Sequence, residues 1–163
     1  MYILHSTRTK NKMSTKTIAT WTSSLTYTTL PTPTIHAIRS FYNWTGCTIA
    51  GSTHPATSIA HNALAPFFGA PTSTLLGLED GKTDAQHAAL INGIASHVHD
   101  YDDTHLETII HPTDPVAAAV LGIAEALQRP VSGEDLITAP VAGVEVECKL
   151  GLAVWPSHYD VGW

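Results

Sequence analysis

Residues 85–98, with the sequence AQHAALINGIASHV, decide the fold class of this chain. Their apolar side chains recur at steps of three and four residues, at Ala85, Ala88, Ile91, Ala95 and Val98. This spacing places the side chains on one face of an α-helix. Because most of them are small, that face can approach another helix closely. The segment therefore predicts a helix that packs within a bundle.

Two other helices are predicted from their capping residues. Thr32 as the N-cap and Pro33 as the first helical residue predict a helix that continues to Gly51, which we interpret as the residue just beyond its end. Asp114-Pro115 predicts the same kind of start for a helix that continues to Leu127. Apolar residues follow both starts at helical spacing, as they do in residues 85–98.

The rest of the chain adds helices and almost no strand pattern. Ser132-Gly133-Glu134-Asp135 resembles a capping box and predicts a helix through Leu150. A short helix is expected over residues 54–66 and a loop over residues 67–82, where Ser73 to Leu78 is the best candidate for an extended piece. The predicted fold class is an all-α helical bundle.

The amino-acid composition excludes several classes of protein. The chain has 163 residues, of which 44% are apolar and 13% charged, a balance that suits one globular domain and excludes a disordered chain. No apolar run approaches the roughly 20 residues of a membrane span. Cys47 and Cys148 lie far apart in the sequence and make no CxxC motif, so we expect buried, reduced thiols in an intracellular protein.

Charge is unevenly distributed along the chain. All 14 acidic residues lie between Glu79 and Trp163, whereas most basic residues of the first half lie in its first sixteen positions. The acidic half would repel nucleic acid, because binding to its phosphates requires clustered Lys and Arg. We interpret residues 1–14 as a flexible leader, with a mitochondrial transit peptide as the alternative, because the stretch is rich in Ser and Thr and has no acid. The expected location is cytoplasmic, or alternatively mitochondrial.

Acidic and histidine residues are densest in residues 96–105, SHVHDYDDTH, and in His111-Pro112. Three interpretations compete here. The first is a solvated acidic turn whose aspartates cap the neighbouring helices. The second is a metal site, with ligands from His97, His99, Asp103 and His105. The third is an acid–base site, because carboxylates and imidazoles placed together can exchange protons near pH 7.

Several segments resemble one family in the same order along the chain. Residues 92–105, NGIASHVHDYDDTH, resemble the signature of the 2-methylcitrate dehydratase and cis-aconitate decarboxylase family, often written MmgE/PrpD. Residues 41–52 resemble its first long helix, His111-Pro112 its histidine-proline pair, residues 132–146 a later helix, and Gly162-Trp163 its glycine-tryptophan. The resemblance covers roughly residues 15–163.

The resemblance implies a fold, a chemistry and a set of site residues. Residues 15–163 are expected to form an incomplete helical domain of this family, without its smaller α+β lid domain. The implied activity is that of a lyase acting on a tricarboxylate, with no cofactor and no metal. Asp100 and Thr104 match positions that line the family's substrate pocket, and the position of His111 is that of a candidate proton-transfer group.

Some alternatives remain open from the sequence. Water loss from 2-methylcitrate or another alkylcitrate and loss of carbon dioxide from cis-aconitate are not distinguished, because the groups that decide between them are expected beyond Trp163. Partners are expected to be the tricarboxylate and either a second copy or a full-length relative, but no nucleic acid and no membrane. Two other functions stay possible: a non-catalytic remnant that pairs with a full-length relative, and a His/Asp metal-binding helical protein.

Overall fold

The computed structural model describes residues 15–30 and 34–162 of the chain. Its first half runs through α1 (Thr15–Ser24), a 3₁₀ turn η1 (Tyr27–Thr29), α2 (Thr34–Gly51), α3 (Pro55–Leu64), a 3₁₀ turn η2 (Ala65–Phe67), β1 (Ser73–Thr74) and β2 (Lys82–Thr83). The second half runs through α4 (Ala85–His97), α5 (Thr113–Ala126), α6 (Gly133–Val154) and α7 (Ser157–Asp160). The predicted all-α class is confirmed.

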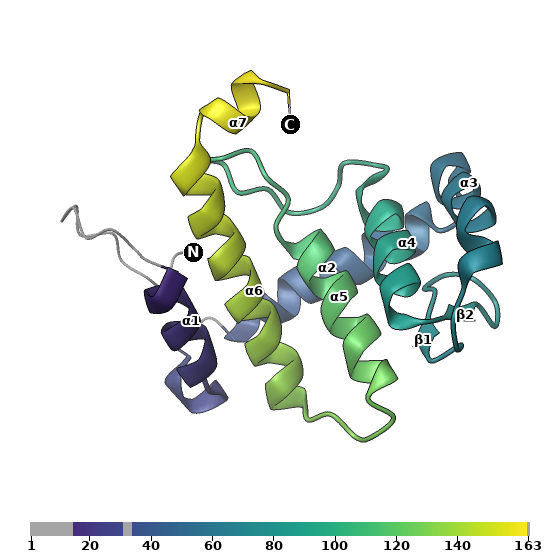
Figure 1. Cartoon of the computed structure of the whole chain (residues 1–163), viewed down its shortest axis with the longest axis horizontal. Coiled ribbons are helices and arrows are strands. Elements are labelled where there is room, and N and C mark those ends of the chain that lie inside the picture. The colour runs from purple at the N-terminus through teal and green to yellow at the C-terminus, as the bar shows by residue number, and fades with distance from the viewer. Residues whose placement is uncertain (1–14, 31–33, 163) are drawn as a thin grey trace.

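Helix α4 lies at the centre of the bundle. It packs most extensively against α5 and α2, and α2 crosses behind α4, α5 and α6 (Figure 1). Helix α1, which the sequence pattern did not predict, lies beside α6 at the opposite end from α3 and the strands. The predicted leader, Thr32 and Pro33 fall outside the described residues.

Small residues let α4 approach its neighbours. Ala88, Ile91 and Ala95 of the predicted stripe are at most 2% exposed. Ile91 and Ala88 form one core cluster with Leu75, and Trp44 forms another with alanines of α5. Full burial of a side chain the size of isoleucine stabilises the fold by about 1.5–3 kcal/mol, so this face fixes α4 in the bundle.

The segment predicted as a loop contains a small hairpin. Ser73 pairs with Thr83 and Thr74 with Lys82 in an antiparallel two-stranded sheet. Glu125 of α5 holds the hairpin, because its carboxylate accepts hydrogen bonds from the backbone N–H and the hydroxyl of Thr74 at 2.6 and 2.7 Å. Only the first two residues of the expected extended piece belong to a strand.

Two of the predicted helix ends are wrong. Gly51 is the last residue of α2 and does not lie beyond it. Close packing requires a glycine at this position, because a Cβ on Gly51 would lie 2.0 Å from the backbone oxygen of Ala95. Helix α5 begins at Thr113 with Pro112 as its N-cap residue, so Asp114 is not the cap but a buried residue of the first turn. The carboxylate of Asp103, far from the helix start in sequence, accepts the Thr113 N–H instead.

The predicted cap of α6 is confirmed. The hydroxyl oxygen of Ser132 accepts a hydrogen bond from the backbone N–H of Asp135 at 3.0 Å. Replacing Ser132 by alanine should lower the free energy of unfolding by about 1 kcal/mol, or the melting temperature by roughly 3 °C. Thermal unfolding followed by circular dichroism measures this effect. Ser58→Ala, at an exposed position inside α3, is the matched control, and an equal loss in both variants would contradict the capping role.

Both cysteines are free and buried, as predicted. Burial raises the pKa of both thiols, that of Cys148 to about 11, so neither is a thiolate at neutral pH. In the described part of the chain, none of the helices has the length and apolar character needed to cross a bilayer.

Candidate active site

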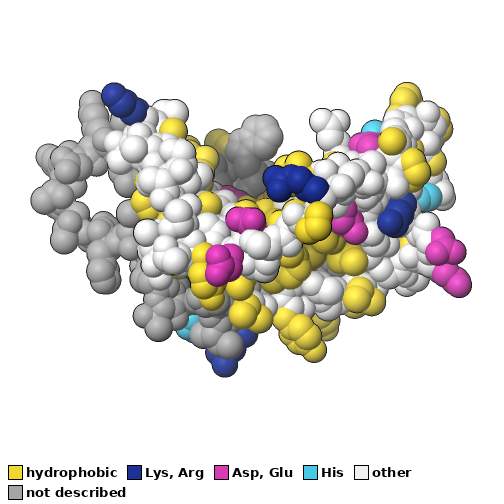
Figure 2. Space-filling view, turned by 90° about the horizontal axis from the view of Figure 1, so that it is seen from below, with side chains coloured by type: hydrophobic (Ala, Val, Ile, Leu, Met, Phe, Trp, Pro, Cys, Tyr) yellow, Lys and Arg dark blue, Asp and Glu magenta, His cyan; other side chains and the backbone are white. Residues whose placement is uncertain are grey.

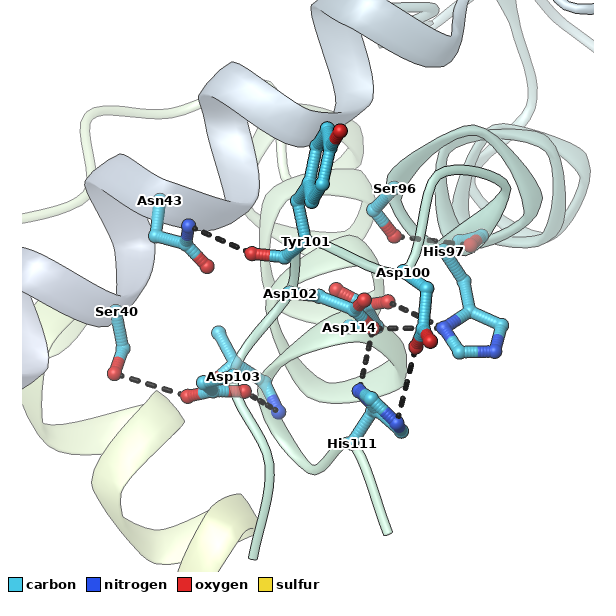
Figure 3. A network of polar contacts seen from close by, with 12 residues as sticks. Ser40, Asn43, Ser96, His97, Asp100, Tyr101, Asp102, Asp103, His111 and Asp114 are labelled. Carbon is cyan, nitrogen blue, oxygen red and sulfur yellow. Dashed lines mark hydrogen bonds and ion pairs between the residues drawn. The ribbon is translucent and has the colours of Figure 1, made fainter.

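Two histidines meet where α4 ends and α5 begins. His97 is the last residue of α4 and His111 lies just before α5, and their ring centroids are 4.7 Å apart. The Asp102 carboxylate lies between them: its Oδ2 is 2.8 Å from Nδ1 of His97 and 3.0 Å from Nδ1 of His111 (Figure 3). The side chain of Asp102 is 1% exposed. A buried carboxylate therefore connects two imidazoles.

The loop between α4 and α5 gives these side chains their positions. Asp100 has a φ of 56°, a left-handed conformation that turns the chain directly after α4, and its N–H donates to the carbonyl of His97. Such a conformation is uncommon for residues other than glycine and is tolerated best by Asn and Asp. It directs the Asp100 carboxylate toward His111, with Oδ1 at 3.6 Å from Nε2.

Helix α2 anchors the other end of this loop. Asp103 accepts hydrogen bonds from the hydroxyl of Ser40 in α2, at 3.0 Å, and from the N–H and hydroxyl of Thr113 in α5. The side-chain amide of Asn43 donates to the carbonyl of Tyr101 at 3.2 Å. These contacts join three elements and fix the path along which Asp102 enters the interior.

A second buried carboxyl group controls the charge of the site. Burial, together with the neighbouring Asp102, raises the pKa of Asp114 to about 8. Burial also pushes the pKa of Asp102 upward, but its contacts with Asp114 and His97 outweigh this effect and hold the pKa below its ordinary value. The pair therefore keeps one proton at neutral pH, on Asp114, and Asp102 remains ionised beside the imidazoles.

Because Asp114 keeps its proton in the folded chain, we expect the stability of the fold to depend on pH. In the folded chain Asp114 keeps its proton up to about pH 8, whereas unfolding returns its pKa to an ordinary value near 3.8. Between these values the folded state binds more protons, so this group makes stability fall as pH rises. Asp114→Asn should remove that fall, which has a limiting slope of about 1.4 kcal/mol per pH unit.

Urea unfolding at several pH values from 5 to 8 checks this expectation. As pH rises, the free energy of unfolding of the native chain should fall relative to that of Asp114→Asn. Asp160→Asn, at an exposed position of α7, is the matched control and should leave the dependence unchanged. Parallel pH curves for the native chain and Asp114→Asn would contradict the shared proton.

The structure separates the three site residues predicted from the sequence. Asp100 and His111 lie together, although the side chain of Asp100 is 78% exposed. Thr104 lines a different pocket, of about 190 Å³, together with Asp103 and Glu145. His111 lines an open groove of about 650 Å³ along α4 and α5. The buried Asp102, and not Asp100, is the carboxylate closer to the imidazole.

The four metal ligands proposed from sequence do not come together. His99 lies edge-on to His54 with ring centroids 5.4 Å apart, His105 contacts the Thr108 hydroxyl, and Asp103 caps α5. Only His97 joins the cluster. Sequence reasoning missed Asp102 and Asp114, and the one signal available for Asp102 was its place between two other aspartates in DYDD.

The fold and the cluster define an all-α domain that presents paired imidazoles and carboxylates at a helix junction. Residues 16–163 match the family model of the MmgE/PrpD N-terminal domain, so the chain belongs to the MmgE/PrpD family. The match includes every residue of the cluster.

Two curated relatives share part of this segment. Human cis-aconitate decarboxylase is 35% identical over 108 residues, which cover 64% of this chain and 22% of the relative. The mouse cis-aconitate decarboxylase is 38% identical over 82 residues, which cover 48% of this chain and 16% of the relative. The matched segments thus span about a fifth of the length of these relatives. Lyase chemistry is supported at the level of the family.

Proposed function

We propose that this chain supplies acid–base groups to a lyase that acts on a tricarboxylate. The reaction is either dehydration of 2-methylcitrate or another alkylcitrate, or decarboxylation of cis-aconitate to itaconate. The observation that carries the proposal is the buried Asp102 carboxylate between His97 and His111, in a domain whose curated relatives are cis-aconitate decarboxylases.

His111 is proposed as the proton carrier. Both reactions develop negative charge on a carbon next to a carboxylate. In decarboxylation the bond to the departing carboxylate breaks, its electron pair stays on carbon, and the imidazolium of His111 donates a proton to that carbon. In dehydration the neutral imidazole removes the proton from carbon, the C–O bond breaks with its electron pair going to oxygen, and the imidazolium so formed returns the proton to this oxygen, which leaves as water. Positioned imidazoles contribute about 10²–10⁴-fold to such steps.

The carboxylates are proposed to position this imidazole. Asp102 faces Nδ1 of His111, and Asp100 lies 3.6 Å from its Nε2. An ionised partner at Nδ1 orients the ring and stabilises its charged form. Thr104 is proposed to hydrogen-bond a substrate carboxylate from its exposed position.

Proton NMR tests the proposal with the purified full chain and two acids, cis-aconitate and 2-methylcitrate. The expected result is formation of an unsaturated product from one of them. Independently, the ring protons of His97 and His111 should shift when that acid is added, with His99 as the unaffected reference. If both acids give no turnover and no shift of the histidine ring protons, the proposal is contradicted.

A second function, association with another polypeptide, is favoured by exposed hydrophobic side chains. Leu106 is 86% exposed, Tyr42 81% and Phe67 72%. Figure 2 shows hydrophobic side chains gathered over the middle of one face with few charged side chains among them. Patches of this kind are typical of interaction surfaces. Light scattering after size exclusion should then give more than one chain per particle, and a monomer at all concentrations would count against this function.

A further inference from the structure

Asp114 is a buried acidic residue to which the proposed reaction assigns no role. It lies in the first turn of α5 and is 4% exposed. Its Oδ2 is 3.8 Å from Nδ1 of His97, the same nitrogen that lies 2.8 Å from Oδ2 of Asp102 (Figure 3). Two carboxyl groups from different elements therefore meet against one imidazole, and Asp102 connects this pair to the ring of His111.

The inner oxygens of this carboxyl pair have no other hydrogen-bond donor. Among the residues the structure describes, Oδ1 of Asp102 and both oxygens of Asp114 are buried and accept no hydrogen bond from another residue. The Ser96 hydroxyl beside Asp114 donates instead to the carbonyl of Gly93 at 2.9 Å. In the same part of the chain the pair forms ion pairs only with histidines, so neither lysine nor arginine compensates a second negative charge. A proton held between the two carboxyl groups satisfies these oxygens and removes that charge.

We propose that Asp114 is a positioning residue: through a proton that it shares with Asp102, it holds the Asp102 carboxylate between the two imidazoles. Asp114 donates this proton, and Asp102 remains the ionised member of the pair. Asp102 in turn orients the ring of His111, whose Nδ1 lies 3.0 Å away. Asp114 thus acts on the reaction through Asp102 and transfers no proton to the substrate. The inference extends the proposed function and rests on it for the role of His111.

Loss of the shared proton is expected to release Asp102. Burial, together with the neighbouring Asp102, raises the pKa of Asp114 to about 8. Below this pH the pair carries one negative charge. Above it two carboxylates remain in contact without a proton, and their repulsion should move Asp102 away from His111. Turnover should therefore be lost as pH rises through about 8.

Other titratable groups surround the pair. They are His97 of α4, Cys47 of α2, and Asp103 and His111 of the loop between α4 and α5. The pKa of the Cys47 thiol is raised by burial, so this group adds no charge at neutral pH. The variants of Asp114 separate its proton from those of the imidazoles.

Proton NMR of the histidine rings, followed from pH 6 to 10 in the full chain, tests the pair without any turnover. The rings of His97 and His111 should show a step in chemical shift near pH 8, beyond their own titration, as Asp114 loses its proton. The step should be absent in Asp114→Asn, because the amide has no proton to lose. Asp160→Asn, at an exposed position of α7, is the matched control and should keep it.

The pH profile of turnover gives a second readout. The kcat of the native chain should fall above about pH 8, whereas that of Asp114→Asn should stay level to higher pH. Asp114→Ala removes the hydrogen-bond donor as well as the charge, so it should lose about tenfold in kcat at neutral pH with little change in KM. Asn keeps a donor and should recover most of this loss. Circular dichroism establishes that each variant is folded.

Three results would overturn the inference: no step near pH 8 in the native rings, the same step in Asp114→Asn, or the same alkaline fall of kcat in both chains. The native titration needs no variant, so it decides the matter even if Asp114→Ala does not fold. If Asp114→Asn removes the step but neither acid is converted, the shared proton is supported and the proposed lyase function fails. The two failures are therefore distinguishable.

Discussion

The His111→Gln variant is expected to lose turnover of the tricarboxylate by about 10²–10⁴-fold in kcat, because the amide cannot carry a proton. Glutamine keeps a polar side chain of similar reach, so KM should change little if His111 transfers the proton and does not hold the substrate. The variant should remain folded, since His111 contributes to the cluster from a loop and is not part of the hydrophobic core. Initial rates from proton NMR measure the effect.

Asp102→Asn separates proton transfer from ring positioning in the same assay. It keeps His111 but removes the carboxylate that lies 3.0 Å from its Nδ1 and orients the ring, so the rate should fall although the proton carrier is still present. His99→Gln is the control for removing a nearby exposed imidazole and should retain the native rate. Full activity in His111→Gln would contradict the assignment of the proton carrier.

Gly51→Ala is expected to destabilise the fold by about 1–3 kcal/mol or more, although it adds a single methyl group. The added Cβ would lie 2.0 Å from the carbonyl oxygen of Ala95 and 2.7 Å from Cγ2 of Val98. The oxygen belongs to the backbone of α4 and cannot rotate away, so α2 and α4 must separate. This separation would also disturb the loop that carries Asp102, because α2 holds that loop through Ser40 and Asn43.

Gly46→Ala provides the matched control for this substitution. It lies in the same helix, and a Cβ there would have no neighbour within 4 Å. Alanine is favoured over glycine inside a helix, so this variant should be more stable by about 0.5–1 kcal/mol. Urea unfolding compares the two variants directly. A similar effect in both would mean that the α2–α4 contact does not limit the size of residue 51.

Local sequence patterns predicted most of the helices because their causes are local. The stripe of Ala88, Ile91 and Ala95 repeats at helical spacing, and Ser132 caps the residue three positions later. Helix α1 was missed because its sequence, TKTIATWTSS, is rich in Thr and Ser, which have low helix propensity, and because none of its residues is buried. The start of α5 was misplaced because its cap comes from Asp103, ten residues earlier.

The sequence by itself determined the all-α class, the family and the segment in which reactive groups concentrate. Only the tertiary structure decided which of those groups meet. His97 and His111 come together because α4 and α5 pack side by side, and Asp102 enters between them because Asp100 turns the chain and α2 holds the loop. Such convergence depends on contacts between residues distant in the chain, which no local spacing encodes. The same reason explains why Gly51 was interpreted as the residue just beyond the helix. It is the last residue of α2, and its close contact with α4 leaves no room for a larger side chain.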